Sequence, residues 1–364
     1  MSSAELSGWE ASKPYRVLLY FVSLVICLVV CLWLCRNVQE IAQSKRRRLV
    51  QAYLAIALVA LALTWYNILS FLHVDYARYR DVDAWLAKSE FMVNAYVTVS
   101  DTTEGWFWSS QLLLFTTVFI VMLVVQSRRH AQPVWHTVAY VWLGFGGAIS
   151  VAFALFACRL QALRAVVKAP ANGKKEPPTT RAQQTGTGGG ALGGLSMVAL
   201  TALILASVGS IFCFPLYAGT RWFKFHLLFV HLALALPAVL PAAKGSSSSS
   251  SVQTPSRSYI LLLATIACLS LGHHLVLWRA LLSGPGAFDT MTLLHAGFAH
   301  FCQAGISWDA VFVTLLATLF AGIESGVLVS ASVFVGSVVL SPAVAFALFL
   351  IRSEMAQQQH AKKQ

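Results

Sequence analysis

Residues 109–126 read SSQLLLFTTVFIVMLVVQ and contain no charged side chain. A helix needs roughly 20 predominantly apolar residues to cross the hydrocarbon core of a bilayer, and this run approaches that length. Its apolar residues are continuous, whereas a strand of a membrane barrel alternates with period two. Because every backbone N–H and C=O group in lipid must find a partner within the protein, the run predicts a membrane-spanning helix.

Seven further stretches repeat this pattern. They cover residues 17–35, 49–72, 134–158, 191–215, 225–242, 258–278 and 309–351. The last block is too long for one span, so we expect two helices that meet in a tight turn near Gly326–Ser332, with a re-entrant first half as the alternative. The chain is therefore predicted to be an all-α, polytopic integral membrane bundle of about eight or nine transmembrane helices, forming a single domain over residues 1–364.

The composition agrees with a membrane protein. Apolar residues make up 57% of the chain, charged residues 11%, and the mean hydropathy is +0.69, whereas soluble domains have about 25% charged residues. The net charge of +12 comes from basic residues at the ends of apolar runs, such as Lys45–Arg48 and Arg128–Arg129. This placement indicates membrane anchoring, and no nucleic-acid partner is expected. Glu5 and Glu10 precede the first run without a small-residue cleavage site, so we expect that run to be retained.

Four connecting segments are long, and one of them, residues 282–308, keeps apolar and aromatic side chains. Residues 73–108 are polar and rich in aromatic side chains, and we interpret them as an interfacial segment. Residues 159–190 are rich in Lys and Gly, and residues 243–257 are rich in Ser. Neither segment can bury enough apolar surface to order itself. They are predicted to be flexible loops.

The cysteines and histidines give no ligand pattern. Cys27, Cys31 and Cys35 recur every four residues on one face of the first helix, where buried cysteine behaves as a small hydrophobe; a metal or redox role is the alternative. No Cys-x-x-Cys pair, nucleotide-binding motif or common hydrolase motif is present in the sequence. We therefore expect no metal and no cofactor.

The densest polar cluster follows the second apolar run and reads DYARYRDVD over residues 75–83. Asp81 and Asp83 form an Asp-x-Asp pair that could hold Mg²⁺ and a diphosphate, but ion pairing with Arg78 and Arg80 is the favoured interpretation. From residue 82 to residue 96, apolar residues recur every three or four positions. That spacing predicts an amphipathic helix on the membrane surface or across the end of the bundle.

A second polar cluster precedes the third apolar run. Asp101 and Glu104 have the spacing of a helix N-terminal cap, and Trp106 and Trp108 suit the aromatic belt of a membrane interface. The sharper hypothesis is that acids and rings converge on a pocket at the bilayer edge. There a carboxylic acid could deliver a proton, and ring faces could stabilise the resulting carbocation.

Two acids occur in the last apolar block. Glu324 lies within Gly322–Gly326, whose glycines have the spacing of closely packed membrane helices. It is either a protonated, buried proton donor or a turn residue at the membrane surface, and the second interpretation is favoured. Asp309 begins the block.

The polar segment resembles a known family at many positions. These are Asp75, Tyr76, Arg78, Tyr79, Arg80, Asp81, Val82, Asp83, Trp85, Leu86, Ser89, Phe91, Ala95, Tyr96, Trp106, Trp108, Ser109, Gln111, Leu112 and Leu113. The pattern resembles the fungal membrane-bound terpene cyclases of meroterpenoid biosynthesis, of the ascofuranone and macrophorin type. Residues 74–113 are the specific part, and Ser307–Asp309, Ser341–Pro342 and Arg352–Glu354 fit more loosely.

The resemblance implies cyclisation of a farnesyl chain on an aromatic or quinone-like head group, started by protonation of a terminal epoxide or alkene and without a redox cofactor. The implied catalytic acids are Asp75, Asp81, Asp83 and Glu104, with Asp309 and Glu324 as weaker candidates. The implied substrate-binding residues are Tyr76, Arg78, Tyr79, Arg80, Trp85, Trp106, Trp108 and Gln111. The implied partners are the lipid bilayer, a hydrophobic prenylated substrate and upstream pathway enzymes, and the implied location is the endoplasmic reticulum.

Three other functions remain open. A transporter or channel would need a polar path through several spans, and few polar residues interrupt the runs. A receptor or sensor would need no acid cluster. A membrane prenyltransferase is disfavoured because paired Asp-rich diphosphate motifs on two helices are missing from the sequence.

Overall fold

The computed structural model describes residues 13–39, 44–79, 81–168, 194–240, 257–283 and 289–362, and every regular element in these ranges is a helix. The helices are α2 (Lys13–Gln39), α3 (Ser44–Ala77), α4 (Val82–Lys88), α5 (Phe91–Ser100), α6 (Thr103–Arg129), α7 (Val134–Gly146), α8 (Ile149–Lys168), α10 (Gly194–Tyr217), α11 (Phe223–Val239), α12 (Arg257–Leu282), α13 (Thr290–Phe298), α14 (Phe301–Ser325), α15 (Val327–Val339) and α16 (Pro342–Lys362). The predicted all-α class is confirmed.

Six of these helices are long and apolar enough to cross a membrane, namely α2, α3, α6, α10, α12 and α14. They make the chain an integral membrane helical bundle. The number is smaller than the expected eight or nine because several apolar runs form shorter helices. The 17 residues of α11 and the 13 residues of α15 reach only about 26 and 20 Å at 1.5 Å per residue.

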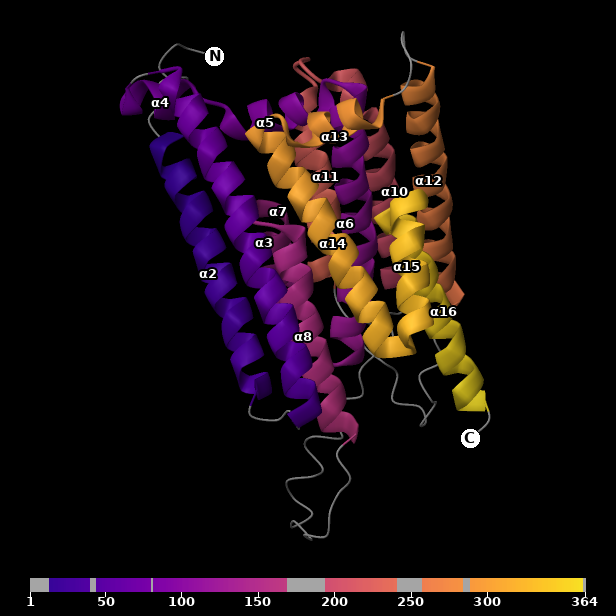
Figure 1. Ribbon diagram of the computed structural model, residues 1–364. Helices are drawn as coiled ribbons and strands as arrows, with labels where there is room; N and C mark the ends of the chain where they lie inside the picture. Colours follow the sequence, from indigo (N-terminus) through magenta and orange to yellow (C-terminus); the bar gives the residue numbers. More distant parts are fainter. Residues whose placement is uncertain are drawn as a thin grey trace.

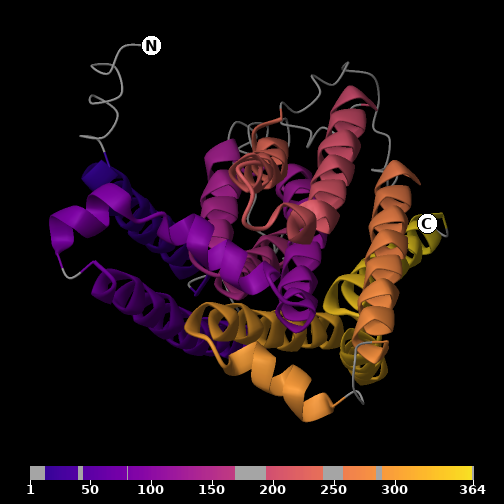
Figure 2. The ribbon, with the colours of Figure 1, turned by 90° about the horizontal axis from the view of Figure 1, so that it is seen from above.

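The bundle is built around α6. Of its membrane-spanning stretch, 89% is buried inside the bundle, the largest share among the six long helices. Figure 1 shows α6 between two groups of helices. Seen from above, α2 and α4 lie at one side of α6, and α12 and α16 lie at the other (Figure 2). Helices α5, α8, α10, α12, α14 and α16 all pack on this central helix, which carries a large part of the core.

The apolar run 134–158 is broken and does not form one span. Helix α7 ends at Gly146 and α8 begins at Ile149, with the N–H groups of Gly147 and Ala148 both bonded to the carbonyl of Leu143. Glycine is needed here because a Cβ on Gly146 would overlap the buried side chain of Leu24 on α2. The break lies inside the bundle, where backbone groups must be satisfied by protein.

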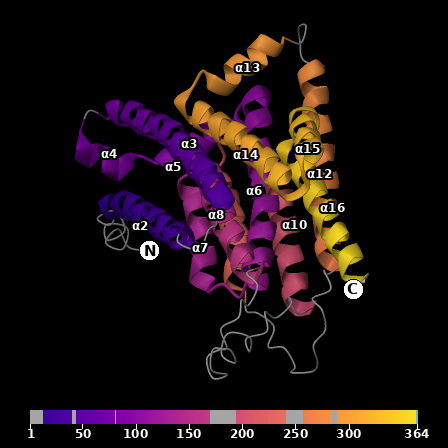
Figure 3. The same ribbon diagram turned by 60° about the horizontal axis from the view of Figure 1, so that its bottom comes forward.

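The block 309–351 contains parts of three helices, where two were expected. The turn is in the predicted place: Gly326, with φ of +91°, joins α14 directly to α15. A second break follows at Leu340–Ser341, and Pro342 then begins α16, a position that proline favours because it needs no N–H partner. The half-length helix is α15, which comes after the turn and lies beside α14 and α16 (Figure 3). It is not the first half of the block, as the re-entrant alternative supposed.

The predicted interfacial helix is divided in two. Helix α4 ends at Lys88 and α5 begins at Phe91, because Ser89 is extended, with ψ of 132°, and its hydroxyl donates to Asp75. Residue 102, and not Asp101, caps α6: the Thr102 hydroxyl accepts from the N–H of Gly105 at 3.0 Å. Of the two predicted flexible loops, α8 extends into the first as far as Lys168, and the other parts, 169–193 and 241–256, lie outside the described residues.

Candidate active site

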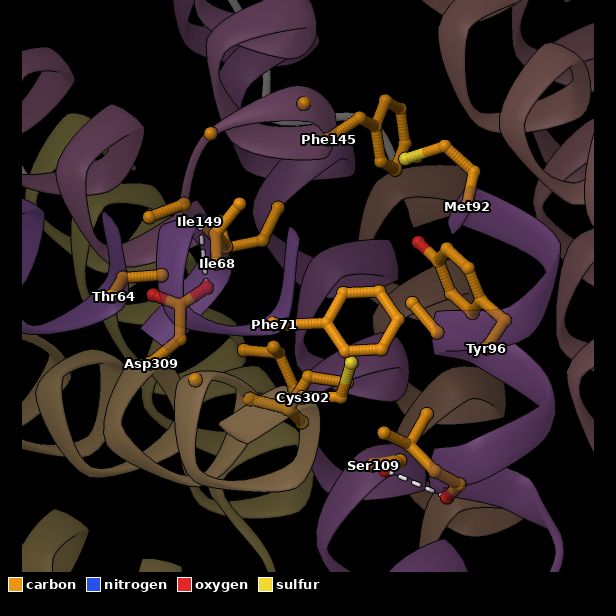
Figure 4. Close-up of a pocket in the computed structure, with 18 of the residues that line it drawn as sticks. Thr64, Ile68, Phe71, Met92, Tyr96, Ser109, Phe145, Ile149, Cys302 and Asp309 are labelled. Carbon is orange, nitrogen blue, oxygen red and sulfur yellow. Dashed lines mark hydrogen bonds between the residues drawn. The ribbon is translucent and has the colours of Figure 1, made fainter. Parts of the chain in front are cut away.

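A cavity of about 160 Å³ lies beside the break between α7 and α8. Residues from α2, α3, α5, α6 and α14 and from the break itself surround it (Figure 4). The lining residues are Tyr20, Thr64, Ile68, Phe71, Leu72, Phe91, Met92, Ala95, Tyr96, Val99, Ser109, Leu112, Leu113, Thr116, Gly144, Phe145, Gly146, Gly147, Ala148, Ile149, Phe301, Cys302, Gly305, Ile306 and Asp309. Most are apolar, and Asp309 is the only acidic residue among them.

Asp309 joins the cavity to the helix break. Its carboxyl oxygens accept hydrogen bonds from the backbone N–H groups of Ile149, at 2.9 Å, and Ser150, at 2.8 Å, at the start of α8. Two N–H groups that would otherwise be unpaired inside the bundle are thereby satisfied. The side chain is only 4% exposed, so an acid is held at membrane depth in a fixed position.

Two influences act on the charge of this carboxyl. Removal from water disfavours the carboxylate form, whereas the partial positive charge at the start of α8 and its two N–H donors favour it. No Lys or Arg side chain lines the cavity or bonds to Asp309 among the described residues. Both protonation states are therefore supported, as a group that gives up and regains a proton requires.

Six aromatic rings form part of the wall. Phe71, Phe145 and Tyr96 face the space in front of Asp309 (Figure 4), and Tyr20, Phe91 and Phe301 complete the set. The face of an aromatic ring carries partial negative charge and attracts a cation within about 6 Å of its centroid. The ring faces can thus stabilise a positive charge in the cavity.

Tyr96 and His231 form a polar pair on the side of the cavity opposite Asp309. The Tyr96 hydroxyl lies 3.0 Å from Nε2 of His231, and Nδ1 of His231 lies 2.7 Å from the carbonyl oxygen of Leu227. A carbonyl only accepts, so Nδ1 carries the hydrogen, and Nε2 accepts from the tyrosine. In Figure 4 the Tyr96 hydroxyl points toward the interior of the cavity, with Phe71 between it and Asp309.

The cavity extends along α14 from the end of the bundle toward its interior. Phe301, 38% exposed, lines its outer part, and Asp309 lies eight residues further along the helix, about 12 Å at 1.5 Å per residue. An engineered cavity of about 150 Å³ holds benzene. The enclosed space therefore accommodates a group of about the size of one isoprene unit, and a longer molecule would extend past Phe301.

The predicted acids of the polar segment do not line this cavity. Asp75 is fully buried and connects α3 to α4: the indole N–H of Trp85 donates to it at 2.9 Å, the Ser89 hydroxyl donates to it, and Arg78 lies 3.8 Å away. These contacts hold α4 against α3, and Figure 1 shows α4 at the edge of the bundle.

The other predicted acids lie further out. Asp81 caps α4 by accepting from the N–H of Ala84 at 2.9 Å, and both it and Asp83 are exposed. Glu104 lies half-buried in the first turn of α6. Tyr76 packs edge-on against Trp85, Tyr79 is half-buried, and Arg80 lies outside the described residues.

Three predicted substrate-binding residues lie on α6. Trp106 packs against Phe214 and His273 and does not line the cavity beside Asp309. Trp108 and Gln111 face a second cavity on the other side of α6. The structure thus separates residues that the sequence pattern placed together.

The remaining candidates have structural partners. Glu324, near the end of α14, pairs with Arg164 and accepts from the amide of Gln161 at 2.8 Å. Cys31 and Cys35 are buried in the core. Within the described ranges, no three His, Cys, Asp or Glu side chains lie close enough together to hold a metal ion.

Sequence reasoning missed the first break, Tyr96 as a polar group of the site, and His231. The break has a signal in Gly144–Gly147, where three glycines interrupt an apolar run. His231 has none, because its partner Tyr96 is 135 residues away in the chain.

Searches against protein-family models, curated proteins and solved structures found no match to this chain. The resemblance to terpene cyclases therefore stays a prediction, and the function is argued from the cavity.

Proposed function

We propose that this chain is a membrane-bound terpene cyclase of meroterpenoid secondary metabolism, located in the endoplasmic reticulum. It would protonate the terminal epoxide or alkene of a farnesylated aromatic or quinone-like substrate and cyclise the prenyl chain. One observation carries the proposal: the acid Asp309 is buried in an apolar cavity walled by aromatic rings.

The substrate is positioned by the shape of the cavity. The terminal isoprene unit fits the enclosed space beside Asp309, and the head group then lies toward Phe301 and the end of the bundle. A prenylated phenol partitions into the bilayer, so it can reach a cavity between membrane helices from the lipid. Exclusion of water also protects a carbocation from premature capture.

Asp309 starts the reaction as the general acid. Its proton forms a C–H bond with a terminal alkene, or an O–H bond with an epoxide oxygen while one C–O bond breaks. The cation that results is attacked by the next double bond of the chain, which forms a C–C bond and moves the charge into the ring. The two N–H groups at the start of α8 then stabilise the carboxylate that Asp309 has become.

Tyr96 ends the reaction. A C–H bond next to the final cation breaks, its electrons form a double bond, and the proton goes to the Tyr96 oxygen. At the same time the Tyr96 hydroxyl passes its own proton to Nε2 of His231. His231 returns this proton to solvent and Asp309 is reprotonated, so the substrate and product are isomers.

The test uses yeast microsomes that contain the protein, supplied with farnesylated phenols with and without a terminal epoxide. We expect a product of unchanged mass and altered chromatographic retention, absent from microsomes that lack the protein. Failure to convert any of these substrates would contradict the proposal.

A transporter is the second candidate, and the two breaks inside the bundle favour it, because interrupted helices form the substrate sites of many transporters. The discriminating measurement is uptake of the same prenylated phenols into vesicles that contain the purified protein. Uptake without conversion would support transport, and conversion without uptake would support the cyclase.

A further inference from the structure

A second cavity, of about 270 Å³, lies on the other side of α6 and α14, beside the break between α15 and α16. The two central helices separate the cavities. On α6, Ser109 and Leu112 face the first and Trp108 and Gln111 the second; on α14, Ile306 and Asp309 face the first and Ala310 and Thr314 the second. The second cavity is lined by Phe107, Trp108, Gln111, His274, Ala310, Val311, Thr314, Leu315, Phe334, Ser337, Val338 and Pro342.

Buried polar atoms without partners face this cavity. The Ser337 side chain is 5% exposed, and its hydroxyl makes no hydrogen bond. One end of the Gln111 amide lies 2.7 Å from Nδ1 of His274, and the other end of the amide has no partner, although the residue is also 5% exposed. Burial of such a group without a hydrogen bond is costly, and native structures rarely leave one unpaired.

The surroundings define what could satisfy these atoms. No acidic or basic side chain apart from His274 lines the cavity, so a charged ligand would have no counter-charge. Phe107, Trp108 and Phe334 supply flat apolar surface, and Phe334 and Val338 are largely exposed at the side that faces lipid. The hydroxyl group of a ligand can both donate and accept a hydrogen bond. It could therefore pair with the Ser337 hydroxyl and with the unpaired end of the Gln111 amide at the same time.

We propose that this cavity is a binding site for a neutral, lipid-soluble alcohol. Its hydroxyl lies between Ser337 and Gln111, and its apolar body lies against the aromatic rings and extends toward the lipid. The position agrees with the general role of interrupted membrane helices, which are tolerated at membrane depth where they line a cavity. The proposal does not depend on cyclase activity, because it uses neither Asp309 nor the first cavity.

Two photoreactive probes test it in membranes that contain the full chain. One is a diazirine-bearing sterol and the other is diazirine-bearing farnesol, so the arms distinguish a membrane sterol from a prenyl alcohol. We expect one or both to label the helices that line the cavity, namely α6, α12, α14, α15 or α16, and we expect competition by the unlabelled alcohol but not by the hydrocarbon that lacks the hydroxyl.

Ser337→Ala is the decisive variant. Since the Ser337 hydroxyl has no protein partner to lose, the variant should fold normally and bind the probe about fivefold more weakly, as expected for one hydrogen bond. The matched control is Ser332→Ala on the same helix, where the serine is exposed and bonds only to the carbonyl of Leu328. Equal labelling of the two variants, equal competition by the hydrocarbon, or labelling confined to helices that do not line the cavity would overturn the proposal.

Discussion

Two apolar runs break inside the bundle, and their backbone groups are satisfied by different chemistry. Between α7 and α8 the carboxyl of Asp309 accepts from two N–H groups. Between α15 and α16 the cap is a neutral hydroxyl, with Ser341 accepting from the N–H of Val344 at 3.1 Å. An acid inside a membrane is far more costly than a hydroxyl. Since a serine can cap such a break, the acid at the first break indicates a role beyond capping.

The same contrast extends to the cavities. The one beside the acid is lined in part by rings and has the hydrogen-bonded pair of Tyr96 and His231 on its opposite side. The one beside Ser341 has only neutral polar groups and His274. The first is suited to proton transfer and the second to binding of a neutral molecule. Three changes test this division.

The largest effect on stability is expected from Asp309→Leu. It leaves two buried N–H groups unpaired, which should lower the free energy of unfolding by about 2–6 kcal/mol. At the second break, Ser341→Ala leaves one such group unpaired and should lower the free energy of unfolding by about 1–3 kcal/mol. Thermal denaturation of the protein in detergent compares them. Equal losses of stability would remove the distinction between the two breaks.

Tyr96→Phe removes the proposed proton acceptor while keeping the ring. Turnover should fall by up to about 100-fold, and products formed by capture of the cation should appear. The matched control is Tyr53→Phe, because Tyr53 is buried, its hydroxyl has no hydrogen bond, and it lies outside the cavity. Product analysis in microsomes makes the comparison. Unchanged turnover and products in Tyr96→Phe would assign the final proton transfer to another group.

Gly147→Ala should disturb the first break alone. An added Cβ would lie 2.8 Å from the carbonyl oxygen of Leu143, and the strain should cost about 1–3 kcal/mol. Gly272→Ala is the control, since nothing lies within 4 Å of a Cβ at that position in α12. There alanine should be neutral or stabilising by up to about 1 kcal/mol. Thermal denaturation measures both, and an unaffected Gly147→Ala variant would show that the break tolerates a side chain.

Much of the fold could be predicted from the sequence. Continuous apolar runs predict the all-α class, and Gly326 predicts the turn that follows α14. The break between α7 and α8 could not be predicted from hydrophobicity, which does not distinguish one helix from two when the breaking residues are themselves small and apolar; the second break has a signal in Pro342. The run 134–158 contains no charged residue, so nothing but its glycines indicates an interruption.

The site was harder to predict for a related reason. The polar segment 75–83 is conspicuous in the sequence because its polar residues are neighbours. In the structure, however, Asp75 holds α4 through a hydrogen bond from Trp85, and Asp81 caps the start of that helix. Asp309 has no charged neighbour in the sequence, and the N–H groups that it accepts from are about 160 residues away. Spacing along one helix cannot reveal a partner on another, so the sequence pattern ranks Asp309 below the acids of the polar segment.

The central claim is that Asp309 donates the proton that starts cyclisation. Asp309→Asn is the closest variant, because asparagine can still accept a hydrogen bond at the start of α8 but has no acidic proton. Microsomes that contain wild-type protein or the variant would be incubated in D₂O with a farnesylated phenol that has a terminal alkene. We predict that wild-type protein yields a cyclic product with one deuterium on carbon, and that the variant yields none while losing less stability than Asp309→Leu, because it still accepts one of the two hydrogen bonds. Cyclisation by Asp309→Asn at the wild-type rate, or a wild-type product without deuterium, would contradict the account.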